Sequence, residues 1–260
     1  MRYYVPELAV LPDKEGLASM LTGLFSKSKH PSPTAERLGG VPFGLPPSAW
    51  PKCTECGKYQ SLLAQLAHHP DRLDLGRQGR MLLVFQCNHD PGMCATWDAF
   101  SGANACIVIE PEDIKDGPTP APDDNLPNDH GVLITGWWAR DDSISESELG
   151  AYFDETTYFE RYEALNRTVT YSTRLGGVPR WIQSPNEAPK PDWRFLGQLD
   201  GTYSFLTPPK YSRPWISPDP ENFEGRTHIG EGPNLGGGLA YLFMRENASR
   251  PDVVMFWQCG

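Results

Sequence analysis

The sequence has no apolar run that approaches the roughly 18 residues required by a membrane-spanning helix. Its start, M-R-Y-Y-V-P-E-L-A-V-L-P, also lacks the basic segment and following apolar segment that mark a secretory signal. From these two absences we expect no membrane partner and a cytoplasmic location.

Positive charge is scarce as well. The chain has 23 Lys and Arg residues against 33 Asp and Glu, which gives a formal net charge of −10. A field of this sign repels nucleic acid and attracts cationic proteins. We therefore expect no nucleic-acid partner and, if the chain binds a protein, a basic one.

Familiar catalytic signatures are missing. The sequence contains no G-x-S-x-G, no H-E-x-x-H and no phosphate-binding Walker sequence. His68 and His69 are adjacent in a loop that ends at Pro70, so we expect them to point apart in an exposed turn. We therefore identify no catalytic residue and no organic cofactor. An unrecognised enzyme with a cleft between two lobes is the alternative.

Turn-forming residues are abundant. The chain has 25 glycines and 26 prolines, together with eight tryptophans, a composition typical of short strands joined by many turns. We predict an α+β protein that is mainly β, with peripheral helices. Apolar runs predict strands at residues 81–86, 105–109, 132–138, 239–244 and 253–257.

Two segments have the apolar spacing of amphipathic helices. The first begins at Pro12 and has its apolar stripe at Leu17, Met20, Leu21, Leu24 and Phe25. The second is predicted over residues 145–165, where Ser145 and Glu148 form a capping box. Its apolar face would contain Leu149, Tyr152, Phe153, Phe159 and Tyr162.

Four of the six cysteines lie between residues 50 and 98, as Cys53-x2-Cys56 and Cys87-x6-Cys94. The first spacing turns the chain tightly enough for two thiolates to bind one ion, and a second pair can complete a tetrahedral site. We predict a zinc ion bound by these four residues. Because four thiolates leave no open coordination position, the zinc would be structural.

Other interpretations of these cysteines stay open at this stage. Cys53 and Cys56 are compatible with a redox pair, although no β-α-β pattern surrounds them. All four are compatible with disulfides in a secreted protein. His89 lies two residues after Cys87 and is a possible replacement for one cysteine ligand.

The hexapeptide R-L-G-G-V-P occurs twice, at residues 37–42 and 174–179. L-L-A-Q-L follows the first copy at 62–66, and F-L-G-Q-L follows the second at 195–199. Each copy later reaches a glycine-led apolar strand. We interpret this order as an internal duplication, in which each Gly-Gly makes a tight turn.

The duplication predicts four regions. Residues 1–36 form an N-terminal helix and linker, and residues 37–140 form a first lobe with the zinc knuckle. Residues 141–173 form a connecting helix, and residues 174–260 form a second lobe without metal-binding cysteines. The predicted architecture is therefore two pseudo-repeated β lobes.

L-G-G-V-P, W-P-x-C-x-x-C-G, L-L-A-Q-L and L-L-V-F-Q-C-x6-C resemble the YwqG-like family of bacterial proteins. The resemblance extends from Leu38 to Trp257. More distantly, these segments resemble the C-terminal region of programmed cell death protein 2. Of the metal-binding cysteines of that family, only those at Cys53, Cys56, Cys87 and Cys94 have counterparts here, and a second cysteine set is missing.

The resemblance implies a two-lobed, mainly β protein without established catalytic residues. Some YwqG-like proteins are encoded beside toxins, which implies an immunity protein that neutralises a basic toxin. The relatives of programmed cell death protein 2 imply instead a chaperone of a basic ribosomal protein. Both roles require a protein partner.

Overall fold

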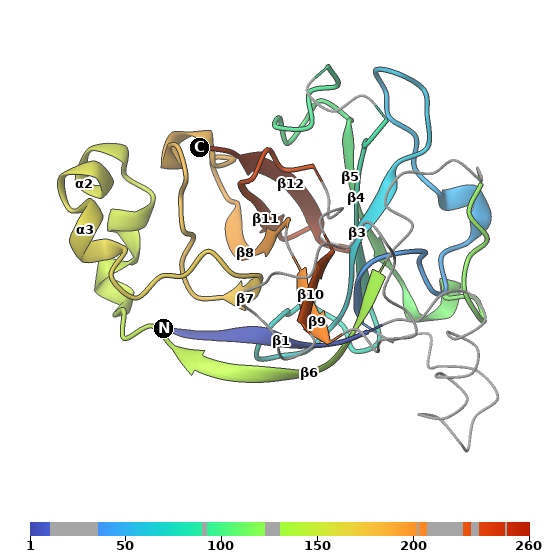
Figure 1. Ribbon diagram of the computed structural model, residues 1–260, viewed down its shortest axis with the longest axis horizontal. Helices are drawn as coiled ribbons and strands as arrows, with labels where there is room; N and C mark the ends of the chain where they lie inside the picture. The colour runs from blue at the N-terminus through green and yellow to red at the C-terminus, as the bar shows by residue number, and fades with distance from the viewer. Residues whose placement is uncertain are drawn as a thin grey trace.

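The computed structural model describes residues 1–10, 36–89, 93–122, 131–201, 203–206, 226–229, 234–247 and 249–260. Its main feature is one ten-stranded antiparallel sheet in the order β12-β11-β8-β7-β1-β6-β2-β3-β4-β5 (Figure 1). The strands of this sheet are β1 (Arg2–Val10), β2 (Arg37–Gly39), β3 (Ser61–Ala67), β4 (Met81–Gln86), β5 (Asn104–Ile109), β6 (Gly131–Asp141), β7 (Arg174–Gly176), β8 (Arg194–Asp200), β11 (Leu239–Arg245) and β12 (Asp252–Gln258). A separate hairpin contains β9 (Tyr203–Leu206) and β10 (Arg226–Ile229).

The sheet curls until its two edge strands, β5 and β12, lie against each other. Side chains rather than a backbone ladder bridge the junction. Asn104 donates from Nδ2 to the carbonyl oxygen of Met255 at 3.1 Å, and Arg250 donates from Nη1 to that of Val108 at 3.3 Å. The result is a nearly closed barrel.

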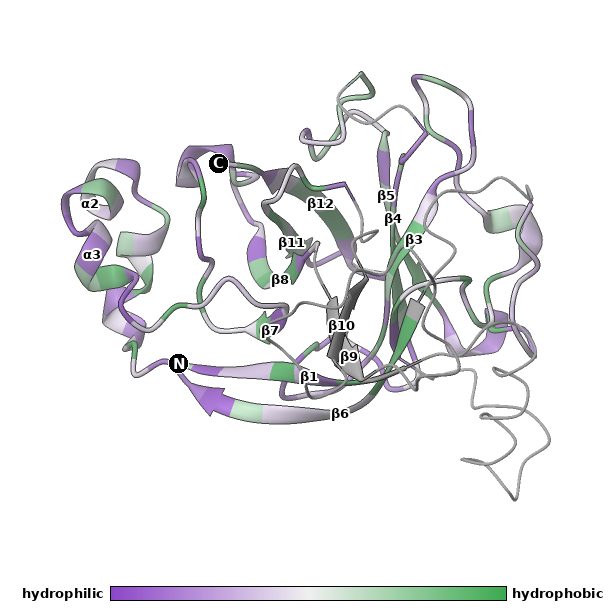
Figure 2. Ribbon diagram, in the orientation of Figure 1, coloured by the Kyte–Doolittle hydropathy of each residue, from purple (hydrophilic) through white to green (hydrophobic). Residues whose placement is uncertain are grey.

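Both faces of β4 and β11 are buried. In β4, Leu82 and Val84 belong to the largest core cluster, which draws on strands from both ends of the sheet. The alternate residues Met81, Leu83 and Phe85 pack on the other face. Figure 2 shows strong hydrophobic colour on β4, β11 and β12. This two-sided burial explains why the apolar runs predicted these strands correctly.

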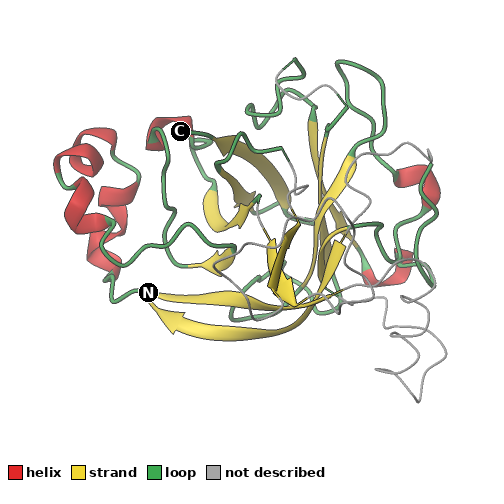
Figure 3. Cartoon of the chain, viewed as in Figure 1, coloured by secondary structure: helices red, strands yellow, loops and turns green. Residues whose placement is uncertain are grey.

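Helical segments lie at the periphery (Figure 3). They are the 3-10 segments η1 (Pro47–Ala49), η2 (Pro111–Asp113), η3 (Glu146–Tyr152) and η4 (Pro185–Glu187), and the α-helices α2 (Glu155–Glu160) and α3 (Tyr162–Leu165). The mainly β architecture with peripheral helices is therefore confirmed.

The single helix predicted over residues 145–165 is wrong in its continuity. Its start is correct, since Ser145 donates its backbone N–H to Glu148 Oε2 at 3.0 Å. Asp154 then leaves helical geometry, and its carboxylate accepts the N–H of Thr157 at 2.9 Å, so a new helix begins. Because the direction changes there, Phe159 is 51% exposed rather than part of a buried face.

The N-terminal region also differs from the prediction. Residues 2–10 form β1, which pairs with β6 on one side and with β7 on the other. Sequence patterning missed this strand because Pro6 and Glu7 interrupt its apolar alternation, and both of its partners are more than a hundred residues away in sequence. The helix and linker predicted between residues 12 and 36 lie almost entirely outside the described residues.

The two R-L-G-G-V-P segments have the same pairing register. Arg37 pairs with Gln65 in β3, and Arg174 pairs with Gln198 in β8. Each of these longer strands contains a β-bulge, whose additional residue, Leu63 or Leu196, lies two positions before the glutamine. Positive φ values occur at all four glycines of the repeats, Gly39, Gly40, Gly176 and Gly177.

The two glutamines also make the same contact. The side-chain oxygen of Gln65 accepts the N–H of Phe43 at 2.7 Å, and that of Gln198 accepts the N–H of Arg180 at 3.0 Å. Phe43 and Arg180 are the residues that follow the two prolines. The glutamine therefore fixes the turn to the neighbouring strand in both places.

The arginine that opens each repeat is buried beneath its own turn. Arg37 donates to the carbonyl oxygen of Val41 at 3.1 Å, and Arg174 donates to that of Val178. Burial lowers the pKa of each arginine to about 10. These equivalent contacts show that the two copies of the hexapeptide adopt the same local structure.

The two strands in the middle of the sheet, β1 and β6, each pair with a strand from the other part of the chain. β6, which follows the first set of strands in sequence, pairs with β2, whereas β1, at the start of the chain, pairs with β7. β1 and β6 also pair with each other along most of their length. Figure 1 shows this long ribbon running from the side of α2 and α3 towards β3, β4 and β5.

We predict that Gln65→Leu and Gln198→Leu each lower the free energy of unfolding by about 1–3 kcal/mol, because each removes the acceptor of a backbone N–H, that of buried Phe43 or half-buried Arg180. Chemical denaturation measures the change. Gln78→Leu, at an exposed position, is the matched control and should change stability by less than about 0.5 kcal/mol. Equal stability of all three variants would contradict the role assigned to the glutamines.

Candidate metal centre

The first cysteine pair lies in the loop between η1 and β3. Cys53 donates its N–H to the carbonyl oxygen of Lys58 at 2.9 Å, and Gly57 donates back to the carbonyl oxygen of Cys53 at 2.9 Å. Gly57 has a φ of 73°, a conformation that glycine adopts without steric cost. These contacts form the tight knuckle that places Cys53 and Cys56 on one side of the loop.

The second pair comes from the end of β4 and the loop that follows it. Cys87 is the first residue after β4, and its N–H donates to the carbonyl oxygen of Ala103 at 2.9 Å. Cys94 lies further along that loop. The carboxylate of Glu55 accepts the N–H of Ala95 at 2.9 Å, which joins the two cysteine-bearing loops.

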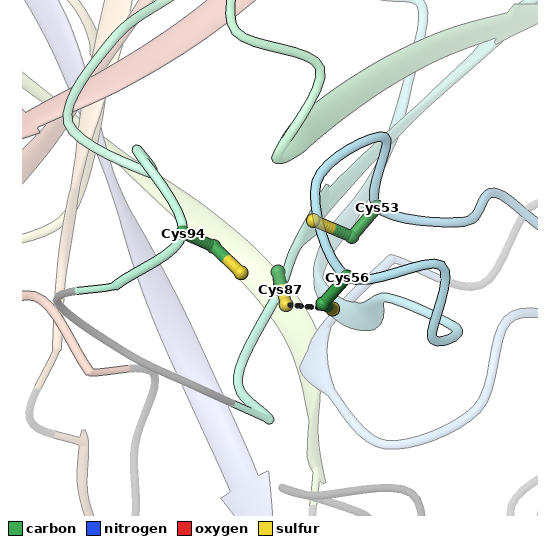
Figure 4. A group of neighbouring side chains, drawn as sticks. All are labelled: Cys53, Cys56, Cys87 and Cys94. Carbon is green, nitrogen blue, oxygen red and sulfur yellow. Dashed lines mark hydrogen bonds between the residues drawn. The ribbon is translucent and has the colours of Figure 1, made fainter.

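The four thiols turn towards a common point (Figure 4). Their Sγ atoms all lie within 4.8 Å of one another, and those of Cys56 and Cys87 are 3.6 Å apart. Tetrahedral thiolate ligands with metal–sulfur bonds of about 2.3 Å would have sulfur atoms about 3.8 Å apart. The observed spacing therefore fits a four-thiolate metal site after a small contraction.

Burial shapes the protonation of these thiols. Burial raises the pKa of Cys87 to about 11, and it also raises the pKa of Cys94. Burial opposes ionisation of Cys56 too, but hydrogen bonds from the Lys58 N–H and the neighbouring thiols lower the pKa of Cys56. A bound cation would compensate for the cost of holding several thiolates in this buried place.

The structure bears on the disulfide and histidine-ligand alternatives to a four-cysteine site. All six cysteines are free, so the disulfide interpretation is not supported. Among the described residues, the group close enough to share a metal contains the four cysteines and not His89. His68 and His69 accept backbone N–H groups in a turn, from Leu75 at 3.0 Å and Asp71 at 3.2 Å.

Sequence reasoning missed the residues that support the cysteines. Thr54 donates its hydroxyl to the carbonyl oxygen of Ser101 at 2.7 Å, and Glu55 receives the N–H of Ala95. Both lie between the first two cysteines, but their partners are 47 and 40 residues away in sequence. No local pattern marks such contacts.

In comparisons with known proteins, no protein-family model and no curated protein matches the chain. Within the described ranges, no helix is both long and apolar enough to cross a membrane. The arrangement of the four thiols is therefore the strongest functional observation.

We predict that the purified chain binds one metal ion and that Cys87→Ser abolishes this binding. Loss of the ion should lower the free energy of unfolding by about 3 kcal/mol or more, because metal-binding free energy is also folding free energy. Elemental analysis and thermal unfolding measure the two effects. Cys259→Ser, outside the cluster, is the control and should keep the metal.

Metal affinity should fall as pH falls. Because burial raises the pKa of Cys87 and of Cys94, both thiols carry protons at neutral pH, and a metal ion must displace them. Each displaced proton contributes about a tenfold change in affinity per pH unit. Competition with a chromophoric chelator between pH 6 and 8 tests this, and a pH-independent affinity would contradict protonated thiols in the metal-free site.

Proposed function

We propose that the chain is a non-catalytic protein-binding protein with a structural zinc ion held by Cys53, Cys56, Cys87 and Cys94. The convergence of the four thiols within 4.8 Å is the observation that supports the metal. Zinc suits this donor set because it accepts four thiolates tetrahedrally. Four protein ligands complete that geometry, so zinc supplies cross-linking rather than a position for substrate or water.

Hydrogen bonds connect the loop that carries Cys94 to the edge strand β12. Thr96, two residues after Cys94, accepts the indole N–H of Trp257 in β12 at 3.0 Å. The carbonyl oxygen of Thr96 accepts from Asn104 Nδ2 at 2.6 Å, and the same nitrogen also donates to Met255. Anchoring Cys94 therefore helps to position the loop that bridges β5 and β12.

We also infer that the two halves arose by internal duplication. The matching registers, bulges and glutamine contacts described above support this origin. One half would contain β1 through β5 and the other β6 through β12, with β9 and β10 inserted in the second. This division differs from the predicted lobes at 37–140 and 174–260, because it assigns β1 to the first half and β6 to the second. In that case the halves have exchanged their first strands, since β1 pairs with β7 and β6 pairs with β2.

Binding is favoured over catalysis by what the surface displays. Large hydrophobic side chains are exposed at several places, including Trp97 at 48%, Phe100 at 65% and Tyr171 at 50%. Aromatic residues of this kind supply much of the binding energy at protein interfaces. Within the described residues, the group of metal-ligating and acidic side chains that does converge is the cysteine cluster.

The partner we propose is a basic protein, because the net charge of −10 would attract it at long range. The resemblance to YwqG-like proteins favours an immunity protein that neutralises a basic toxin. The distant resemblance to programmed cell death protein 2 favours a chaperone of a basic ribosomal protein. An enzyme with an inter-lobe cleft is the remaining alternative. A cytoplasmic location fits all three.

Affinity capture with the intact chain should recover a stoichiometric partner enriched in Lys and Arg. Association with the purified partner should slow markedly between low and physiological salt, because exposed charges are then screened. A toxin partner should lose activity on mixing, whereas a chaperoned protein should gain solubility. An acidic partner, or a small-molecule turnover with no partner at all, would contradict the proposal.

A further inference from the structure

A groove of about 420 Å³ lies over the junction of β5 and β12, and we name it the seam groove. Both edge strands line it with half-buried apolar residues, Ile107 on β5 and Val254 on β12. Phe100 and Trp193 also line it. The groove is therefore built from segments that are far apart in sequence.

The two aromatic residues form one wall. Phe100 comes from the loop after Cys94, and Trp193 immediately precedes β8. Their rings meet edge to face with centroids 6.0 Å apart, and Phe100 is 65% exposed. Such a pair presents a large apolar contact area whose position is already fixed, which reduces the entropic cost of binding.

The charge of the seam groove differs in sign from that of the whole chain. Its charged lining residues are Arg245, Arg250 and Asp252, two cations and one anion, which gives a local charge of +1. Arg245 pairs with Asp252 at 3.0 Å and lies over the Trp193 ring. Arg250 is exposed and uses Nη1 to bind the carbonyl oxygen of Val108, and among the described residues its other guanidinium nitrogens are free to bind a carboxylate.

Backbone groups also face the seam. The carbonyl oxygen of Val108 points towards β12, since it accepts from Arg250. In an antiparallel strand, backbone groups two residues apart point to the same side, so those of Cys106 face the seam as well. Across it, the carbonyl oxygen of Met255 accepts from Asn104. By the same alternation, the backbone groups of Val253 face the seam.

We propose that the seam groove binds an extended peptide segment of a protein partner, with an aliphatic or aromatic side chain next to a carboxylate. The apolar side chain lies against Phe100 and Trp193, and the carboxylate pairs with Arg250. The peptide is held by these side-chain contacts, because the facing backbone groups of β5 and β12 lie close to each other across the seam. This inference rests on the proposed protein-binding function. It implies that a partner with a positive net charge contacts the seam groove through a segment that is locally acidic.

Selection of random nine-residue peptides displayed on phage, with the full-length purified chain as bait, tests this directly. We expect selected peptides to carry Asp or Glu beside Leu, Ile, Phe or Trp. Fluorescence anisotropy should then show at least about tenfold weaker binding for Phe100→Ala and for Arg250→Glu, as expected when an interface anchor is removed. Arg250→Lys should retain more affinity than Arg250→Glu.

Two matched controls lie on the helical segments, away from the seam groove. Phe159→Ala removes a ring that is 51% exposed, and Arg161→Glu reverses a charge whose side chain is 47% exposed. Both should leave peptide affinity within about twofold of the parent chain. Thermal unfolding of all the variants shows whether any loss of binding follows from a loss of folding.

Equal peptide affinity across the groove variants and controls would overturn the proposal, as would selected peptides without acidic residues or a failure to select any peptide. The proposed function fails separately. If a captured partner binds the Phe100→Ala and Arg250→Glu variants as tightly as the parent chain, the groove proposal is wrong while the protein-binding function stands. If no protein is captured but acidic peptides bind as described, the function fails and the groove assignment stands.

Discussion

The loops that carry the four cysteines depend on the thiols themselves for their packing. Among the described residues, the buried members of the apolar cluster there are Cys53, Cys87, Cys94 and Ala103, with Cys56 packed against them. Four thiols supply little apolar area, and two of them have raised pKa values because they are buried. A metal ion bound to four thiolates would replace the missing hydrophobic core, which is how small loop-rich regions are commonly stabilised. The loop beyond Cys94, and the seam that it bridges, would then depend on the same interaction.

The central ribbon imposes a second constraint. Because β1 pairs with β7, and β6 pairs with both β1 and β2, the two ends of the sheet cannot separate without breaking strand pairs. The shared core reinforces this, since its buried members come from β2, β3 and β4 as well as from β8, β11 and β12. A relative movement of rigid lobes is therefore not a natural mode of this fold. Function is better served by fixed surface features, such as the exposed rings beside the seam, than by closure of an inter-lobe cleft.

The sequence predicted those parts of the structure whose signal is local. Strands such as β4 and β11 are continuous apolar runs because both faces are buried, and the paired cysteine spacing identified the metal-ligand candidates directly. The break at Asp154 was missed because one capping side chain overrides an otherwise helical pattern. β1 was missed because its partners lie far away in sequence. The contact between Glu55 and Ala95 could not be predicted either, because the two residues are far apart in sequence and no local spacing specifies their contact.

The proposed zinc ion is held by four thiolates. X-ray absorption spectroscopy at the zinc edge tests this most directly, because it reports both the identity and the distance of the ligand atoms. The account predicts about one zinc per chain, with four sulfur atoms at roughly 2.3 Å and no lighter ligand. A shell of nitrogen or oxygen atoms near 2.0 Å would place histidine, carboxylate or water on the metal and contradict a closed thiolate site. A fully folded chain without any bound metal would contradict the claim altogether.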